Sequence, residues 1–141
     1  MNLAGILTRG RRTAERPMVD TCIIRRRTGM ATDPVTGKVT PTYTTVYPSA
    51  ADIAAGNNGK CKVQTFTNRE LLHNGGEHQF IIQRYEVQVP VSAVGIRSND
   101  EVLMVASVHD PDLANRSYRI VALMNKSAAT ARRLGVEEMV A

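Results

Sequence analysis

Side chains that could support catalysis or bind a metal occur at two histidine-containing segments. His109-Asp110-Pro111-Asp112 places three possible ligands for a hard cation close together. However, Asp-Pro between two predicted strands is typical of a turn, and His109 lacks a second histidine at the i+4 spacing of helical zinc sites. His73 and His78 flank Asn74-Gly75-Gly76, which is typical of a loop. The sequence therefore predicts turns rather than metal sites at both segments.

Cys22 and Cys61 are the remaining reactive side chains, and each stands alone on a predicted strand. The pattern favours two half-buried thiols; a disulfide, which a reducing cytosol opposes, and a catalytic thiol are the alternatives. The sequence contains no glycine-rich phosphate loop, HExxH, nucleophile elbow or CxxC motif. We therefore expect a protein that is not an enzyme and that carries no metal and no cofactor.

The elements that position these residues show a period of two, which is typical of strands. Segments rich in Val, Ile, Thr and Tyr predict strands near residues 18–27, 39–47, 60–66, 79–89, 101–108 and 117–125. Residues 128–139 have mixed helix and strand signals, and only the family resemblance given below favours a final strand, near residues 130–139. Asp33-Pro34-Val35-Thr36-Gly37 between the first two is a turn sequence, since Pro34 presets φ and Gly37 accepts a left-handed conformation. The absence of crossover helices excludes a parallel α/β fold. The predicted fold is mostly β, an antiparallel barrel or sandwich, and we favour a small antiparallel β-barrel.

The first sixteen residues form a separate N-terminal amphipathic helical segment in this prediction, and residues 17–141 form the single barrel domain. Leu3, Ile6 and Leu7 have helical spacing, which predicts a short amphipathic helix over residues 2–14 that Pro17 ends. So short a helix needs a surface to be stable. We expect it to dock on its own barrel or on a neighbouring subunit, not on a membrane.

The net charge of +5 lies entirely in the first 27 residues. This segment contains seven arginines (9, 11, 12, 16, 25, 26 and 27) and only two acidic residues, Glu15 and Asp20. In the rest of the chain the basic and acidic residues are equal in number. A basic end suggests contact with nucleic acid or with an acidic protein face. The alternative is a solvated helix face and a strand edge on which arginines oppose aggregation.

Two segments are longer than a hairpin connection requires, namely Pro48–Lys60 and Thr67–Glu77. Loops of this length in a compact domain are usually functional or disordered. Pro48–Lys60 consists mostly of small, uncharged residues, and we expect a long flexible loop there.

The aromatic residues offer little support for base stacking, which needs rings on an exposed sheet face. The six are scattered at positions that resemble a core: Tyr43, Tyr47, Phe66, Phe80, Tyr85 and Tyr118. Arginine contacts with phosphate stay possible, and they would be independent of base sequence.

Length and composition fit one domain of 141 residues with 43% hydrophobic residues, enough for a core of Val, Ile, Leu, Met and Ala. No apolar run approaches the roughly 20 residues that cross a bilayer, and residues 1–16 lack the features of a secretory signal. We expect a soluble protein made in a cytosol.

The order of the predicted strands and turns resembles the head-to-tail stoppers, or head-closure proteins, of long-tailed bacteriophages. The similar segments run from about residue 18 to about residue 138: Asp20-Thr21-Cys22-Ile23-Ile24-Arg25-Arg26, Asp33-Pro34 with Gly37, Cys61-Lys62-Val63-Gln64, Tyr85-Glu86-Val87-Gln88-Val89-Pro90, Asn99-Asp100-Glu101-Val102, and Asp110-Pro111-Asp112-Leu113 followed by Tyr118-Arg119-Ile120-Val121. Each segment alone is only a strand or a turn, so the resemblance depends on their order and spacing.

The resemblance implies a structural protein of the virion neck, assembled in the cytoplasm of the bacterial host, that closes the DNA-filled capsid and presents a docking surface to the tail. It implies a homo-oligomeric ring, twelve-fold by preference and six-fold as the alternative. Its partners would be the head-tail adaptor above, the tail terminator or tail tube below, and packaged DNA without sequence preference. A tail-terminator or tail-completion protein and, in another class, a small nucleic-acid-binding β-barrel module are the alternative functions.

The resemblance also implies a loop from each subunit that converges on the ring axis to retain DNA. We expect the channel residues to be Pro48, Ala51, Asp52, Ile53, Gly56, Asn57, Asn58, Gly59 and Lys60. At the N-terminus, Leu3, Ile6 and Leu7 would bury against protein while Arg9, Arg11 and Arg12 meet an acidic adaptor surface.

Overall fold

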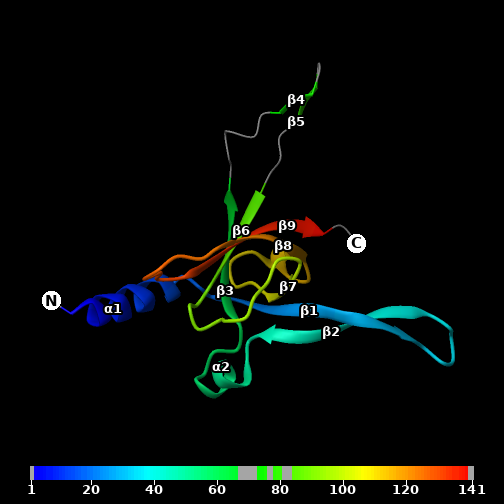
Figure 1. The fold of residues 1–141 in the computed structure, drawn as a ribbon, viewed down its shortest axis with the longest axis horizontal. Helices are drawn as coiled ribbons and strands as arrows, with labels where there is room; N and C mark the ends of the chain where they lie inside the picture. Colours follow the sequence, from blue (N-terminus) through cyan, green and yellow to red (C-terminus); the bar gives the residue numbers. More distant parts are fainter. Residues whose placement is uncertain (1, 67–72, 76–77, 81–83, 140–141) are drawn as a thin grey trace.

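The computed structural model describes residues 2–66, 73–75, 78–80 and 84–139, and it confirms the mostly β prediction (Figure 1). The elements are α1 (Leu3–Glu15), β1 (Asp20–Thr32), β2 (Val39–Tyr47), α2 (Ala50–Ala54), β3 (Lys60–Phe66), β4 (His73–Gly75), β5 (His78–Phe80), β6 (Arg84–Val89), β7 (Glu101–Ala106), the 3-10 helix η1 (Pro111–Leu113), β8 (Ser117–Met124) and β9 (Arg132–Met139). No helix among these is long and apolar enough to cross a bilayer.

Six antiparallel strands close into a barrel in the order β1-β3-β6-β9-β8-β7, and β7 pairs back with β1. The closing ladder runs from Thr21 opposite Ala106 to Arg25 opposite Glu101. Strand β2 lies outside this ring and pairs with β1 alone. The barrel predicted from alternation and turns is therefore confirmed.

The barrel interior is filled by inward-facing residues of all six barrel strands and by Tyr47 of β2. Thirteen buried residues form one cluster: Cys22, Ile24, Tyr47, Cys61, Val87, Val89, Ala93, Val102, Met104, Tyr118, Ile120, Leu134 and Val136. Two tyrosines supplement the aliphatic core, and the ring of Tyr118 packs on that of Tyr85 with centroids 5.6 Å apart. Cys22 and Cys61 are fully buried free thiols, so the expectation of half-buried thiols is corrected.

The alternation of side chains between the two faces of β8 is interrupted after Ile120. A bulge at Val121 shifts the register, because Ile120 pairs with Val136 and Ala122 with Gly135. One extra residue exchanges the two faces of a strand. Leu123 therefore packs against the core, and Met124 is 42% exposed.

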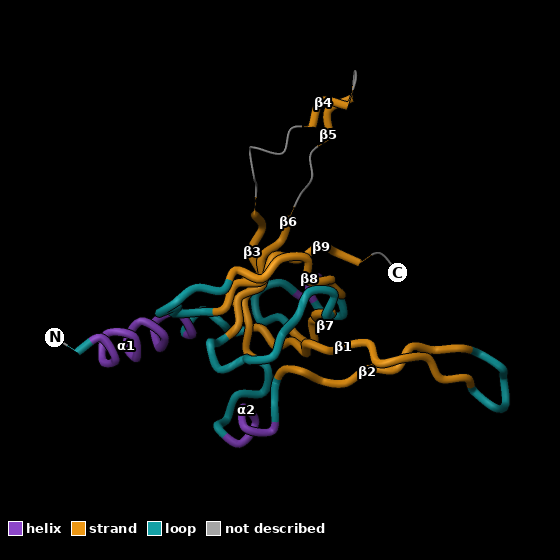
Figure 2. Tube along the Cα trace, in the orientation of Figure 1, coloured by secondary structure: helices purple, strands orange, loops and turns teal. Residues whose placement is uncertain are grey.

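Strand β1 is longer than the predicted span of 18–27, and with β2 it forms a ribbon that leaves the barrel (Figure 2). Every residue from 27 to 41 is exposed; we call this segment the arm. Its tip has the predicted turn, in which Asp33 accepts hydrogen bonds from the backbone N–H groups of Val35 and Gly37, both at 2.8 Å.

The region between β3 and β6 differs from the predicted pattern of one loop and one long strand. Short strands β4 and β5 pair with each other, so residues 73–75 of the predicted Thr67–Glu77 loop are a strand. Residues 67–72 and 76–77 of that loop, and residues 81–83 of the predicted strand 79–89, lie outside the described residues.

At Gly59, just before β3, the main chain passes very close to the main chain of β1. Its carbonyl accepts a 2.8 Å hydrogen bond from the N–H of Cys22, its φ is +109°, and a Cβ there would lie 2.3 Å from the Cys22 carbonyl oxygen. A side chain would therefore force the β1 and β3 backbones apart where the barrel begins to close.

We expect Gly59→Ala to prevent folding or to cost more than about 4 kcal/mol of unfolding free energy, because it combines backbone strain with a collision between main chains. Gly56→Ala is the matched control, since Gly56 also has positive φ (+84°) but open space around its Cα. Its cost should stay near 1 kcal/mol. Urea unfolding measures both, and equal losses would show that conformational strain alone matters at Gly59.

Candidate functional site

The predicted channel loop, Pro48–Lys60, contains regular structure and a hydrogen-bonded base, so the expectation of an irregular flexible segment is corrected. Helix α2 begins at a capping box in which the Asp52 N–H donates to Ser49 Oγ at 3.2 Å and the Ser49 N–H donates to Asp52 Oδ2 at 2.9 Å. Burial raises the pKa of Asp52, but the hydrogen bonds from Ser49 outweigh it, and the pKa lies below its usual value of 3.8. Asp52 therefore holds the loop in shape.

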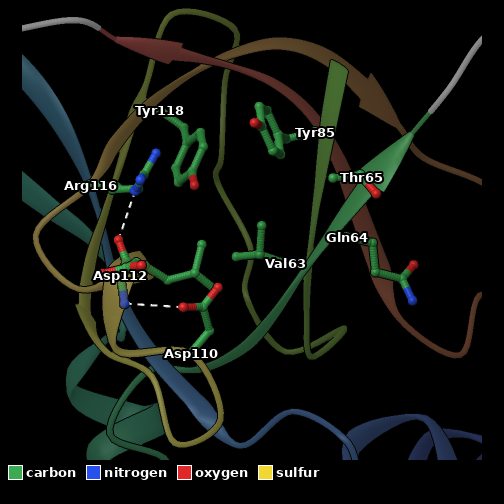
Figure 3. Close-up of a pocket in the computed structure, with 9 residues that line it drawn as sticks. Val63, Gln64, Thr65, Tyr85, Asp110, Asp112, Arg116 and Tyr118 are labelled. Carbon is green, nitrogen blue, oxygen red and sulfur yellow. Dashed lines mark hydrogen bonds between the residues drawn. The ribbon is translucent and has the colours of Figure 1, made fainter. Parts of the chain in front are cut away.

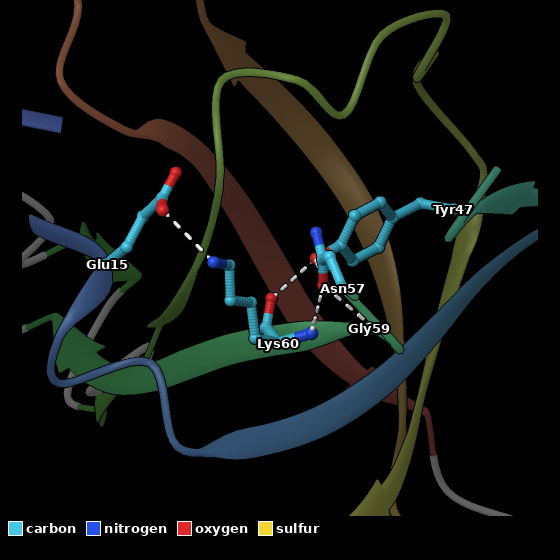
Figure 4. A network of polar contacts seen from close by, with 5 residues as sticks. All are labelled: Glu15, Tyr47, Asn57, Gly59 and Lys60. Atoms are coloured by element: carbon cyan, nitrogen blue, oxygen red, sulfur yellow. Dashed lines mark hydrogen bonds and ion pairs between the residues drawn. The ribbon is translucent and has the colours of Figure 1, made fainter. Parts of the chain in front are cut away.

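Asn57 fixes the other end of the loop (Figure 4). Its side-chain oxygen accepts hydrogen bonds from the N–H groups of Gly59 and Lys60, both at 3.0 Å, and from the Tyr47 hydroxyl at 3.2 Å. The same hydroxyl lies 2.7 Å from the Lys60 carbonyl oxygen, and burial raises the pKa of Tyr47. Lys60 Nζ then contacts Glu15 of helix α1 at 3.0 Å.

The predicted channel residues consequently divide into three groups by their burial. Asp52, Asn57 and Gly59 are buried and serve the fold, and Pro48 and Lys60 are half-buried. The four that a partner or a ligand can contact most freely are Ala51, Ile53, Gly56 and Asn58. The outer surface of the loop is thus small, uncharged and held on a rigid base.

Helix α1 lies against the barrel only by its C-terminal half. Leu3 and Ile6 are 63% and 48% exposed, whereas Leu7 is half-buried. Arg11 is half-buried and donates from Nε to the Ala129 carbonyl oxygen at 3.2 Å, so part of its guanidinium is engaged within the subunit, and its contact with an adaptor stays a prediction. Arg9 and Arg12 are exposed and stay candidates for partner contact.

The base of the arm is held by two arginines that the sequence reasoning did not single out. Arg26 forms a two-pronged contact with Asp100, with Nε–Oδ1 and Nη2–Oδ2 distances of 2.9 Å each, and Nη2 also reaches the Gly95 carbonyl oxygen at 2.7 Å. Asp100 is 2% exposed and accepts a further hydrogen bond from the Arg97 N–H. The hydrogen bond that Arg26 donates to Asp100 raises the pKa of Arg26.

Arg25, on the other face of β1, completes the base of the arm. Its guanidinium lies 3.9 Å from the centroid of the Tyr43 ring and its Nε lies 3.3 Å from Glu101 Oε2. The signal in the sequence was the pairing of Arg25-Arg26 with Asp100-Glu101, which the β1–β7 register brings together.

A cleft of about 720 Å³ opens in the barrel wall between β3 and the η1–β8 segment (Figure 3). Val63, Tyr85 and Tyr118 form its floor, and burial raises the pKa of Tyr118. Asp110 and Asp112 form the rim, where Asp110 caps η1 as the predicted turn requires. Arg116 there is paired with Glu138 at 2.7 Å. Among the described residues that line the cleft, none is a nucleophile paired with a base.

The histidine and cysteine expectations can be compared with the structure only in part. In the part of the chain that the structure describes, no three His, Cys, Asp or Glu side chains converge as a metal site requires. His109 is exposed beside the η1 turn, and the side chains of His73 and His78 lie outside the description. The absence of catalysis stays a prediction.

We expect Asp100→Asn to lower the unfolding free energy by about 2 kcal/mol, because Asp100 is a buried carboxylate that accepts hydrogen bonds from the Arg26 guanidinium and from the Arg97 N–H. Amide exchange in residues 28–42 should accelerate as the arm loosens. Glu137→Gln, which breaks an exposed pair with Arg119, should cost less than about 0.5 kcal/mol. Unchanged exchange in the arm would mean that Asp100 does not hold it.

The lowered pKa of Asp52 predicts a pH-dependent contribution to stability. A carboxyl whose pKa is depressed by folding stabilises the protein above its unfolded pKa of 3.8 and loses this effect as the pH falls through its folded value. A double-mutant cycle of Ser49→Ala and Asp52→Asn should show a coupling of about 1 kcal/mol at pH 7 that is lost as the pH falls below 3.8 and Asp52 becomes protonated. A coupling that is equal at both pH values would contradict this role.

Comparisons with curated proteins and with solved structures found no match. Residues 10–137, which include all six barrel strands except the last residues of β9, match the family described as a family of unknown function, DUF6093. This match covers most of the chain, from the C-terminal half of helix α1 onward. The chain therefore belongs to the DUF6093 family, whose function is unknown.

Proposed function

We propose that this protein is a structural component of a virion neck, a head-to-tail stopper that closes the portal channel of a DNA-filled capsid and provides the docking surface for the tail. The resemblance in strand order supports this proposal, and so does the shape of the subunit. In this role it is assembled in the cytoplasm of the bacterial host, forms a ring, and contacts an adaptor above and a tail component below.

The observation that carries the proposal is the arm. Two-stranded ribbons are at best marginally stable in water when nothing packs on them. Here Met30 (53%), Val39 (51%) and the tip residue Val35 (90%) are all exposed. The contacts of Arg25 and Arg26 hold the base of the arm, so it projects in a fixed direction with its apolar side chains uncovered.

A ring supplies the missing surface. In a closed ring every subunit makes the same heterologous contact with the next one. An arm that lies across the neighbouring barrel would cover its own strand edges and its apolar side chains, which otherwise favour aggregation. Pro41 removes one N–H donor from β2, an edge strand, and this limits unintended strand pairing there.

Helix α1 provides a second projection, which Figure 1 shows on the opposite side of the barrel from the arm. Leu3 and Ile6 extend past the barrel with Arg9 and Arg12 nearby, a combination that suits an acidic protein surface with an apolar centre. We assign this half of the helix to the adaptor or to the adjacent subunit.

In the same proposal the loop Pro48–Lys60 lines the channel as a short rigid projection, not as a hinge. Its exposed residues Ala51, Ile53, Gly56 and Asn58 are uncharged, so they would oppose DNA by occupying space without binding phosphate.

The alternatives are distinguishable. A tail-terminator or tail-completion protein would also form a ring but would bind tails rather than filled heads. A nucleic-acid-binding barrel would bind DNA as a monomer with steep salt dependence. Among the described side chains, Tyr47 and Tyr118 are buried and Tyr43 lies under Arg25, which leaves them poorly placed for base stacking.

The decisive variant joins Arg27 to Tyr43, which face each other across the ribbon, through Asn-Gly in place of residues 28–42. The barrel should keep its melting temperature within a few degrees, because the removed residues lie outside the core. Light scattering and electron micrographs should show that the wild-type chain forms rings, alone or on tail-less heads, and that the shortened chain does not. Thr36→Ala at the tip is the control and should assemble normally.

Two outcomes would overturn the proposal. One is a wild-type chain that neither assembles nor binds tail-less heads; the other is a shortened chain that assembles and retains packaged DNA as well as the full-length protein. Salt-dependent DNA binding by a monomer would favour the nucleic-acid-binding module instead.

A further inference from the structure

A small cavity of about 90 Å³ lies between helix α1 and the turn that joins β8 to β9. Three cationic side chains line it, Arg11, Lys126 and Arg132, and no acidic residue does. The helix approaches this turn closely because it has a glycine at the contact: a Cβ on Gly10 would lie 2.9 Å from Thr130 Cγ2. The fold thus brings together cations from two distant parts of the chain, the N-terminal helix and the β8–β9 connection.

Arg132 is fixed in the cavity wall by its two terminal nitrogens. Nη1 donates to Asn125 Oδ1 at 3.2 Å and Nη2 donates to the Val91 carbonyl oxygen at 3.1 Å. Its Nε is buried and has no hydrogen-bond partner among the described residues. Buried donors in proteins are nearly always paired, so this N–H indicates a missing acceptor.

Charge balance leads to the same conclusion. Arg25, Arg26, Arg116 and Arg119 each contact a carboxylate. In contrast, the structure shows no ion pair for Arg11, Lys126 or Arg132 within the residues that it describes. Arg11 uses Nε for the Ala129 carbonyl oxygen, which holds its guanidinium beside the cavity.

We propose that this cavity binds a small oxyanion, either a tetrahedral phosphate or sulfate or the carboxylate of an acidic side chain. Guanidinium groups bind both through charge-assisted hydrogen bonds. A volume of 90 Å³ equals that of about three water molecules, so it accommodates one such group and excludes a whole nucleotide. Arg11, Lys126 and Arg132 surround the anion with positive charge, and the Arg132 Nε–H is the buried donor in the cavity wall that still lacks an acceptor among the described residues.

The test follows the arginine Nε–H resonances of the ¹⁵N-labelled full-length protein during titration with sodium phosphate, sulfate or acetate at constant ionic strength. The Arg132 Nε–H resonance should shift and saturate. Arg132→Gln should weaken binding at least about tenfold and Arg11→Gln about three- to tenfold, as expected when a hydrogen bond to a charged group is lost.

Two neighbouring arginines provide matched controls. Arg133 adjoins Arg132 on β9 but its side chain is 54% exposed, and Arg12 adjoins Arg11 on an exposed face of the helix. Arg133→Gln and Arg12→Gln should leave the dissociation constant within about twofold, since exposed charges contribute little.

Saturation by phosphate and sulfate would identify a tetrahedral oxyanion as the ligand class, and saturation by acetate alone would identify a carboxylate. The proposal is wrong if none of the three anions saturates the Arg132 signal, or if the control variants weaken binding as much as the cavity variants. If Arg132→Gln fails to fold, the comparison of Arg11→Gln with Arg12→Gln decides the question. Neither of these two helix positions is fully buried, so both variants should fold.

Discussion

The organisation of this protein depends on a single strand that must pair with three others. Residues 20–21 of β1 pair with β3, residues 21–25 pair with β7 on the opposite edge, and residues 24–32 pair with β2. Strands β3 and β2 pair with the same edge of β1, β3 up to Thr21 and β2 from Ile24 onward. The chain that connects β2 to β3 must therefore leave the sheet at Tyr47 and return beside it at Lys60. The loop Pro48–Lys60 makes this detour, and Gly59 makes the return possible because it allows contact between main chains at Cys22. The hydrogen bonds of Asp52 and Asn57 then follow from the need to hold a tight detour in one shape.

The arginines of the first 27 residues, although adjacent in sequence, have different physical roles. Arg25 and Arg26 are held by an aromatic ring and by carboxylates at the base of the arm, and Arg11 packs against the turn after β8. Arg9, Arg12, Arg16 and Arg27 are exposed. The basic N-terminal region is therefore no uniform electrostatic patch: part of its charge is neutralised inside the fold, part lines a cavity and part is available to a partner.

The strands and the barrel could be predicted from the sequence because alternation and turn residues are local signals. The helix and the Asp33–Gly37 turn were predictable for the same reason, within one residue at each end of the helix. The Val121 bulge could not be predicted, although the apolar side chains of Val121 and Leu123 already interrupt the alternation of apolar and polar residues along this strand. The order in Pro48–Lys60 was also missed, even though Ser49 and Asp52 have the spacing of a capping box. The pairing of Arg26 with Asp100 and the cavity around Arg132 depend on strand register and on helix docking, which no local pattern specifies.

The closing ladder between β1 and β7 also determines when the barrel can form during synthesis. Thr21 pairs with Ala106, and β6 and β8 both pair with β9, so the ring of strands stays open until β9 has left the ribosome. The arm, in contrast, is a hairpin of neighbouring residues that can form early. Contacts of such long sequence separation slow folding and keep apolar strands exposed to solvent meanwhile. A translating ribosome thus presents the ribbon first and the barrel last, and the unfinished interior of the barrel is what a chaperone would meet.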